Sequence, residues 1–431
     1  MNLKTRARSW LMRYMASERA LEQQRSRGRA ARKRDGHPPT VHYFHQVDDP
    51  YSHLVAQRLD ALRHHYALRF EPHLVSAPAP EYQGNTEHFT AWARADAQLV
   101  AAHYGVEFAP GETAPSLSAI ARANGTLARH LELNDFAEAA FDAGRALWAG
   151  WDSPGSGSED AGVAAVKRGT TLRQSLGHYL GGMFYYEGEW FWGLDRARLL
   201  EARLREDGFG DPQAPLCVPV PAVPTAAPKP DDEDIVFEYF PSLRSPYTAI
   251  GHARVLAMIE RTGVTTRVRP VMPMMMRGVP APREKQRYIM ADSGREGRAC
   301  GSPMQRIVDP FGEPVKRAFA LFPGALAQGK SMEFVTAYLQ AAWVDGVDIT
   351  RERGLARVAQ SAGLDLATLR SDAGSADWQA LLEENLQAMF THNLWGVPSF
   401  RVTGGAASAD FACWGQDRIW RVEAEIAARR R

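Results

Sequence analysis

Ser245 and Thr248 lie in the stretch Arg244-Ser-Pro-Tyr-Thr, where an apolar run ends and a helical pattern begins. Ser before Pro is a common helix start, because the hydroxyl caps an unpaired N–H group and the proline gives up no helical hydrogen bond. A helix start also presents free N–H groups and the positive end of the helix dipole, so it can hold an anion. The stretch is therefore either an ordinary cap or a site for an anionic group such as a thiolate.

The elements that would position these residues occur twice along the chain. Each half opens with a β pattern, Thr-Val-His-Tyr-Phe-His-Gln from Thr40 and Asp-Ile-Val-Phe-Glu-Tyr-Phe from Asp234. Each then turns at a Pro-Tyr-Ser/Thr sequence into a helical stripe, returns to a second β pattern, and continues through a long helical region. Each closes with Trp-Gly-x-Asp-Arg and a last helix, starting at Trp192 or Trp414. We expect an α/β fold made of two tandem units, each with a helical insertion.

The composition favours a soluble globular protein of two domains. The chain has 431 residues, 45% of them apolar and 23% charged, with a net charge of +1. So small a charge argues against wholesale nucleic-acid binding, and no apolar run reaches the length of a membrane span. The three cysteines are sparse and form no Cys-x-x-Cys, which fits a reducing, cytoplasmic compartment.

Composition also predicts the domain boundaries. Residues 1–36 carry eleven Lys/Arg against three Asp/Glu. They read either as a solvated basic arm or as a surface helix for an anionic partner, with Trp10, Leu11, Tyr14 and Met15 on one side. Residues 37–210 form the first domain, the Pro-rich and then acidic residues 211–233 a linker, and residues 234–431 the second domain.

The second domain resembles a known family. The residues that carry the resemblance are Arg-Ser-Pro-Tyr-Thr-Ala-Ile-Gly (244–251), the segments 278–292 and 341–349, Trp-Gly-Val-Pro-Ser-Phe-Arg-Val (395–402) and Trp-Gly-Gln-Asp-Arg (414–418). In this order they resemble the 2-hydroxychromene-2-carboxylate isomerases and kappa-class glutathione transferases, the cysteine-poor branch of the DsbA-like thioredoxin fold. The first domain is similar to the same family only at its ends, which indicates a degenerate copy.

The resemblance implies a glutathione site. Redox relatives carry Cys-x-x-Cys where this chain has Ser245 and Thr248, so a self-contained disulfide oxidoreductase is excluded at this stage. The family's matching serine stabilises the glutathione thiolate. A cis peptide bond at Val397-Pro398 would offer the backbone of Val397 to the cysteinyl part of glutathione. The alternatives are an ordinary cap at Ser245 and a trans proline at a strand edge.

The resemblance also implies where the rest of the tripeptide would bind. Gln416 and Asp417 would hold the γ-glutamyl carboxylate and ammonium group, although an acidic residue at a helix start is also a common cap. Arg244 and Lys285, with Arg277, Arg295 and Arg298, could form a cationic rim for a carboxylate. Each could equally be a solvated surface charge. The remaining predicted binding residues are Tyr247 and Thr248.

The first domain departs from the pattern at two of three positions. Asp49 replaces Ser245, which puts a negative charge where a thiolate would lie, and Ser52 matches Thr248. Met183 aligns with Pro398. We therefore expect this domain to be catalytically silent. Its histidines suggest a metal site only weakly, because His42 and His45 point to opposite faces of a strand, and we expect none.

The sequence thus predicts a glutathione-dependent isomerase or transferase acting on a small electrophilic, aromatic or unsaturated compound. Glutathione would be its cosubstrate. The alternative is a non-catalytic thioredoxin-fold protein for binding or assembly. Because single-domain relatives often dimerise, we expect the tandem to be a monomer with an internal pseudo-dimer. A tight homodimer in sedimentation would contradict that expectation.

Overall fold

The computed structural model describes residues 1–151, 157–220, 234–407 and 409–430. These residues divide into two compact units. The C-terminal unit comprises residues 1–20, 234–281 and 289–430, and the N-terminal unit comprises the described residues of 21–220 together with 282–288. The predicted linker is described only at residues 211–220, and its other residues lie outside the described part of the chain.

The C-terminal unit is built on a four-stranded sheet in the order β6-β5-β7-β8. β5 and β6 are parallel, and the other two pairs are antiparallel. The bounds of its strands and helices are β5 (Val236–Phe240), β6 (Thr265–Val268), β7 (Ser399–Thr403), β8 (Phe411–Trp414), α10 (Pro246–Thr262), η2 (Met274–Arg277), α11 (Arg283–Ala299), α12 (Glu313–Ala327), α13 (Ser331–Leu339), η3 (Gln340–Asp345), α14 (Glu352–Ser361), α15 (Leu366–Ala373), α16 (Trp378–Phe390), η4 (Gln416–Arg418) and α17 (Ile419–Arg429).

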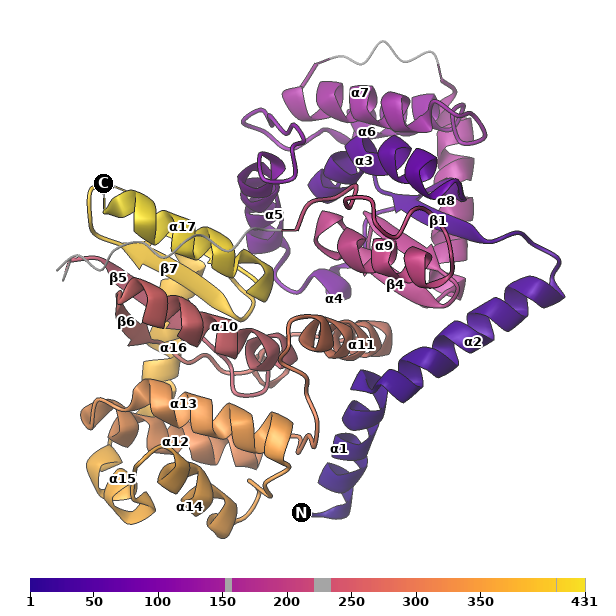
Figure 1. Cartoon of the computed structure of the whole chain (residues 1–431). Helices are drawn as coiled ribbons and strands as arrows, with labels where there is room; N and C mark the ends of the chain where they lie inside the picture. The colour runs from indigo at the N-terminus through magenta and orange to yellow at the C-terminus, as the bar shows by residue number, and fades with distance from the viewer. Residues whose placement is uncertain (152–156, 221–233, 408, 431) are drawn as a thin grey trace. The chain divides into compact units, whose positions relative to one another are not determined.

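The N-terminal unit contains a second four-stranded sheet with the corresponding order, β2-β1-β3-β4. Again the first two strands along the chain are parallel and the other pairs antiparallel. The bounds of its strands and helices are β1 (Thr40–His45), β2 (Arg69–Leu74), β3 (Met183–Tyr186), β4 (Glu189–Trp192), α3 (Pro50–Tyr66), α4 (Pro80–Gln83), α5 (Thr86–Ala101), α6 (Leu117–Leu127), α7 (Phe136–Ala149), α8 (Glu159–Ser175), η1 (Leu194–Arg196) and α9 (Ala197–Glu206). The prediction of two α/β units with helical insertions is confirmed (Figure 1).

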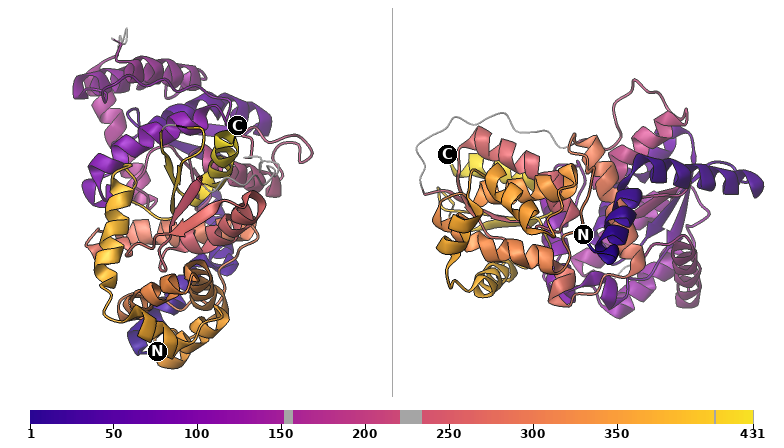
Figure 2. Two further views of the ribbon diagram at one scale, coloured as in Figure 1. Left: turned by 90° about the vertical axis from the view of Figure 1, so that its left-hand side faces the viewer. Right: turned by 90° about the horizontal axis from the view of Figure 1, so that it is seen from below.

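The helical insertion of the C-terminal unit forms a cluster of its own beside the sheet. Helices α12 to α15, drawn in orange, contact one another and bury apolar side chains such as Phe319, Phe322 and Leu369 (Figures 1 and 2). α10 and α17 pack together, and α17 contacts β7. The end of β5 pairs with the start of β7, Phe240 with Ser399, so the turn into α10 and the start of β7 lie at the same end of the sheet.

Residues 1–36 form two helices, α1 (Leu3–Ala16) and α2 (Glu18–Arg34). In the C-terminal unit, α1 buries Met12 and Ala16 in the core of the helical insertion, while Trp10 and Leu11 stay exposed. In the N-terminal unit, α2 buries no residue completely and is held by ion pairs. The reading of this segment as a solvated arm is therefore wrong, because both helices pack on folded units.

The ion pairs of α2 involve three arginines and a group of acidic side chains of its unit. Arg25 Nε lies 2.7 Å from Glu189 Oε2, and Arg29 Nη2 lies 2.7 Å from Asp207 Oδ1. Arg32 pairs with Glu187, which is almost fully buried. Because the acidic partners have so little access to water, these pairs fix the helix more firmly than exposed pairs would.

Within the described residues, no helix combines the length and the apolar character needed to cross a membrane.

Candidate functional site

Ser245 lies in extended backbone (φ −89°, ψ 121°) directly before α10, and Pro246 is the first helical residue. Its Oγ accepts a hydrogen bond from the Thr248 N–H at 3.1 Å. The same hydroxyl donates to the carbonyl oxygen of Val397 at 3.3 Å. Ser245 is therefore a helix cap, which was one of the two alternatives that the sequence left open. It also contacts the segment that carries Pro398.

The Val397-Pro398 peptide bond is cis, as predicted. Pro398 is buried, and its carbonyl oxygen accepts a hydrogen bond from the Gly415 N–H at 2.9 Å. Val397 is only half-buried. Its N–H has no hydrogen-bond partner among the described residues, whereas its carbonyl is held by Ser245. The start of β7 thus presents a backbone donor next to the Ser245 hydroxyl.

Thr248 and Tyr247 differ in how they face the site. Thr248 is fully buried, and its hydroxyl accepts from the Ser242 N–H at 3.4 Å, so it supports the turn from inside. Its predicted role as a binding residue is therefore not favoured. Tyr247 is half-buried, and its hydroxyl donates to Asp292 Oδ2 at 2.8 Å. Asp292 in turn accepts from Arg295 at 3.0 Å, which places Tyr247 in a network leading into α11.

Arg244 is engaged inside the C-terminal unit. Its Nε lies 2.9 Å from Asp309 Oδ1, and its guanidinium lies over the ring of Phe311 at 4.8 Å. The other carboxylate oxygen of Asp309 accepts from Arg8 of α1 at 2.8 Å. Asp309 has no exposed surface, so the two arginines together balance one buried carboxylate. Arg244 helps to hold α1 and is not directed to a rim.

The cations predicted for a rim donate hydrogen bonds to protein groups. Arg277 donates to the Trp395 carbonyl at 3.1 Å, and Arg298 donates to the Ala16 carbonyl at 2.7 Å. Lys285 belongs to the N-terminal unit, where its Nζ donates to the Tyr82 carbonyl at 2.7 Å. Burial lowers the pKa of Lys285 to about 8. Each of these cations is therefore hydrogen-bonded to a backbone carbonyl of its own unit.

Gln416 and Asp417 start the last helix of the C-terminal unit, as predicted, but they differ in access. Gln416 is 1% exposed, its Oε1 accepts from Arg254, and its Nε2 donates to Glu296 at 3.5 Å. Its amide is occupied within the protein in this state, which the sequence did not indicate. Asp417 is half-buried and accepts from Gln416 at Oδ1. Asp417 is therefore the better placed of the two for a ligand.

The N-terminal unit has an equivalent of this site with different residues. Asp49 caps α3 and accepts from the N–H and the hydroxyl of Ser52, both at 2.8 Å. In the sheet, Met183 pairs with Phe44 and Trp192 just as Ser399 pairs with Phe240 and Trp414.

This register moves the equivalent of Pro398 by one residue. The Gly182 carbonyl accepts from Gly193 as the Pro398 carbonyl accepts from Gly415. The alignment of Met183 with Pro398 is therefore wrong, and Gly182 occupies that place. Gly182 has a φ of +62°, and a Cβ there would lie 3.0 Å from Asp49 Oδ2, so the turn favours glycine. The unit keeps the cap and the close turn but has no proline at this position.

The carboxyl group of Asp49 is held largely away from water. This burial raises its pKa to about 6, despite the hydrogen bonds from Ser52 that favour the charged form. At neutral pH the group is therefore mostly an anion at the start of α3. A second anion, such as a thiolate, would be repelled at this place.

The histidines of the N-terminal unit have an arrangement that the sequence analysis missed. His42, Glu71 and His73 lie on neighbouring strands with their ligating atoms within 4.8 Å of one another. The sequence analysis named His42 but neither Glu71 nor His73. The sequence Glu71-Pro72-His73 on a predicted strand is the signal for this group, because residues two apart on a strand point to the same face.

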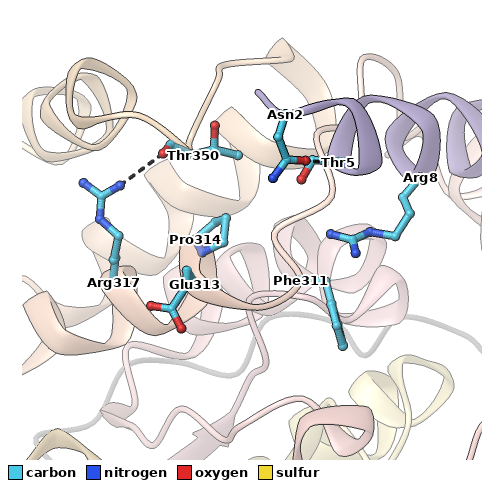
Figure 3. A pocket seen from close by; sticks show the side chains of 8 residues that line it. All are labelled: Asn2, Thr5, Arg8, Phe311, Glu313, Pro314, Arg317 and Thr350. Atoms are coloured by element: carbon cyan, nitrogen blue, oxygen red, sulfur yellow. Dashed lines mark hydrogen bonds between the residues drawn. The ribbon is translucent and has the colours of Figure 1, made fainter.

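A hollow of about 380 Å³ lies in the C-terminal unit between the start of α1 and the start of α12. Figure 3 shows Arg8, Phe311 and Arg317 around it, with Arg317 bonded to the Thr350 carbonyl at 3.1 Å. None of the predicted site residues lines this hollow. It is a separate feature of the interface between α1 and the insertion.

The cysteines do not form a redox pair in the structure. Cys217, Cys300 and Cys413 are free thiols, and Cys413 is buried on β8. Burial is the main cause that raises the pKa of Cys217, to about 11, which disfavours its thiolate.

Comparison with known proteins supports the fold of the C-terminal part. The family model of the DsbA-like thioredoxin domain matches residues 236–427. No curated protein sequence matches the chain. Among solved structures, a putative protein disulfide isomerase from Nitrosomonas europaea is 16% identical, with a TM-score of 0.36, over 45% of this chain and 97% of that one.

Two further solved structures are similar over the same share of the chain. A 2-hydroxychromene-2-carboxylate isomerase is 18% identical, with a TM-score of 0.36, over 45% of this chain and 95% of that one. The cytosolic disulfide reductase DsbM from Pseudomonas aeruginosa is 18% identical, with a TM-score of 0.36, over 45% of this chain and 98% of that one. The family match gives residues 236–427 a DsbA-like thioredoxin fold, and the second sheet, in the N-terminal unit, lies outside that match.

Proposed function

We propose that the C-terminal unit binds glutathione at Ser245 and Val397-Pro398 and uses its thiolate on a small electrophilic, aromatic or unsaturated compound. The observation that carries this proposal is the 3.3 Å contact between the Ser245 hydroxyl and the Val397 carbonyl oxygen. It joins a helix start that can hold an anion to a strand start that can pair with a peptide.

The helix start supplies the means to favour a thiolate. A free thiol has a pKa of about 8.5, so only a few per cent is ionised at neutral pH. The dipole of α10 and a hydroxyl donor at Ser245 would stabilise the ionised sulfur and lower that pKa. To donate to a sulfur, the Ser245 hydroxyl must release the Val397 carbonyl, which costs one weak hydrogen bond.

The strand start supplies the docking edge for the tripeptide backbone. The Val397 N–H would donate to a carbonyl of the cysteinyl residue, and the Val397 carbonyl, once released, would accept its N–H. Because the Val397 N–H has no partner among the described residues, this docking breaks no bond on the donor side. Of the other predicted residues we assign only Asp417 to the ligand, through the ammonium group of the γ-glutamyl end.

The chemistry follows from the sulfur that the tripeptide carries. The thiol proton passes to solvent, and the thiolate adds to the electrophilic carbon of an activated double bond of the substrate. A carbon–sulfur bond forms, the π bond breaks, and its electron pair moves to the conjugated group, which takes up a proton from solvent. A transferase keeps that bond, and an isomerase breaks it again after rotation about the neighbouring bond. We also propose that the chain is not a self-contained disulfide oxidoreductase, because Ser245 and Thr248 occupy the positions where such enzymes need thiols.

Titration calorimetry with glutathione and with S-methylglutathione tests the proposal. We expect both ligands to bind the protein in the micromolar to millimolar range. Pro398→Ala should weaken both ligands at least tenfold, since the docking edge depends on the local backbone. Ser245→Ala should weaken glutathione a few-fold and leave S-methylglutathione unchanged, because only the free thiol can ionise. Asp49→Ala, at the equivalent position of the N-terminal unit, is the matched control and should change neither.

One observation favours a second function, a non-catalytic binding or assembly module. Gln416 and Arg244 are both hydrogen-bonded to other side chains of the protein, so two of the predicted glutathione contacts are already engaged. No binding of either ligand by the folded protein would overturn the glutathione site and favour the module.

A further inference from the structure

Three metal-ligating side chains lie on one face of the sheet of the N-terminal unit. In the parallel pairing of β1 and β2, His42 is opposite Glu71, and His73 follows Glu71 by two residues on the same strand. Residues two apart on a strand share a face, so all three side chains stand on the same side. Phe44, two residues after His42 on β1, stands on the same face of the sheet. It packs in a cluster with Leu172 of α8 and with Leu176, which caps the end of that helix.

The ligating atoms are close to the spacing that a metal ion requires. His42 Nδ1 lies 3.0 Å from His73 Nε2, and Glu71 Oε1 lies 3.9 Å from the same Nε2. Nitrogen ligands bound tetrahedrally to Zn²⁺ at about 2.0–2.1 Å are about 3.3 Å apart. The two imidazoles therefore need to part by only a few tenths of an ångström, and the flexible Glu71 side chain needs to approach.

The environment fixes the rings and keeps the ligands accessible. The His73 ring stacks on Phe44 with centroids 5.0 Å apart, and the His42 ring lies 6.2 Å from that of Tyr185. The His73 side chain is 14% exposed and that of Glu71 36%.

The C-terminal sheet has charged residues that form ion pairs at the three positions corresponding to His42, Glu71 and His73. Its register puts Glu238 of β5 opposite Arg267 of β6. Arg269 follows Arg267 by two residues and lies just beyond the end of β6. There the three side chains form ion pairs, with Glu238 Oε1 lying 3.6 Å from Arg267 and 2.7 Å from Arg269. Complementary charges thus satisfy the same three places in one sheet. In the other sheet two imidazoles and one carboxylate take their place.

We propose that His42, Glu71 and His73 form a binding site for a divalent transition-metal ion, with Zn²⁺ as its first candidate. Two imidazoles select a transition metal over Mg²⁺ or Ca²⁺, which prefer oxygen ligands. Three protein ligands on a partly exposed face leave a coordination position open for water or a small ligand. Among the described residues this is the group of three or more such side chains that could hold an ion.

The competing explanation is a hydrogen bond between two neutral imidazoles, one donating and one accepting. In that case the histidines would only replace the ion pair of the C-terminal sheet. Arg69, 3.4 Å from Glu71 Oε2, also competes with a metal ion for this carboxylate. The two explanations differ in whether the folded protein binds a metal ion at these residues.

The test uses the full chain without a histidine tag, freed of metal by a chelator and titrated with Zn²⁺ against a chromophoric competitor. We expect one equivalent to bind at micromolar affinity or tighter. His42→Gln combined with His73→Gln removes both imidazoles without adding a charge opposite Glu71, so it should keep the fold and weaken binding at least a hundredfold. His64→Ala, which removes an exposed histidine elsewhere in the unit, is the control and should change nothing.

Two results would overturn the proposal. One is the absence of Zn²⁺, Co²⁺ or Ni²⁺ binding at up to millimolar metal by the folded protein. The other is full binding by the double variant. If the double variant does not fold, as judged by circular dichroism, the single variants His73→Gln and Glu71→Gln decide. Each should weaken binding at least tenfold if the three residues are ligands, and neither should if the ion binds elsewhere. This site lies in the other unit from Ser245, so its outcome is independent of glutathione binding.

Discussion

Ser245 and Asp49 show how one residue sets the chemistry of a shared position. Both lie in extended backbone before a proline-initiated helix, and both accept a hydrogen bond from the N–H three residues on. Ser245 brings a neutral hydroxyl and Asp49 brings a charge. The same local fold can therefore favour an anionic ligand in one unit and exclude it in the other.

The raised pKa of Asp49 predicts a pH-dependent cost in stability. Its carboxyl has a pKa of about 6 when folded and about 3.8 otherwise, so the folded state holds the proton more tightly. Stability from this group is complete below pH 4 and is lost as pH rises through 6. Asp49→Asn keeps the cap and removes the titration. It should become more stable than the natural protein by about 1–2 kcal/mol above pH 7.

Urea unfolding at a series of pH values, read for the N-terminal unit, measures this difference. The advantage of Asp49→Asn should grow between pH 4 and 6 and then stay level. A constant difference across this range would contradict the raised pKa. Ser52→Ala, which removes the hydroxyl that favours the charged carboxylate, should act in the opposite direction from Asp49→Asn.

The Ser-Pro helix start predicted the cap at Ser245 from neighbouring residues alone, and the family resemblance predicted the cis bond at Pro398. The partners of the other predicted residues depend on packing between distant parts of the chain. The partner of Arg244 is Asp309, 65 positions away, and its second partner Arg8 is 301 positions from Asp309. Burial of Gln416 likewise depends on Arg254 and Glu296, which no local pattern connects to it.

The helices α1 and α2 show how backbone contact positions an element. A Cβ at Gly294 of α11 would lie 2.8 Å from the Cα of Ala16, so α1 packs directly against bare backbone there. A Cβ at Gly28 of α2 would lie 2.8 Å from the N atom of Gly188 in the turn between β3 and β4. The basic charge of residues 1–36 predicted that they lie at the surface. It could not predict these contacts, because a glycine contributes nothing to a pattern of charged residues.

Replacing Gly294 by alanine should loosen α1 alone, and replacing Gly28 by alanine should loosen α2 alone. Gly294→Ala must push α1 away from α11 and should cost about 1–3 kcal/mol locally. Gly28→Ala should do the same to α2. Hydrogen exchange should therefore rise over residues 3–16 in the first variant and over residues 18–34 in the second. Each variant is the control for the other, and unchanged exchange in both would show that the helices do not depend on these contacts.

At the scale of the whole molecule, the two units carry two different ligand sites in our account. The sheets share their strand order. The C-terminal unit has Ser245 and the cis Pro398, and the N-terminal unit has His42, Glu71 and His73 on one face of its sheet. We propose that the units arose by duplication and then diverged. The sequence predicted both units from their repeated order, and it could not predict the exact register that replaced Met183 by Gly182.

Ligand-specific stabilisation should separate the units in calorimetry. A ligand at a hundred times its Kd stabilises the unit that binds it by about 2.7 kcal/mol. Glutathione should therefore raise the unfolding transition that Pro398→Ala shifts. Zn²⁺ should raise the other transition, and this rise should be lost in the variant that combines His42→Gln with His73→Gln. If either ligand raised both transitions equally, the sites would not be confined to separate units.

The ionisation of the bound thiol tests the central claim most directly. Ultraviolet absorbance of the thiolate, followed against pH with glutathione bound, gives the pKa of that sulfur. We expect it to lie well below the ordinary value of about 8.5 in the natural protein and to return toward that value in Ser245→Ala. An unshifted pKa in the natural protein, or a lowered pKa that Ser245→Ala leaves unchanged, would contradict the proposed role of Ser245.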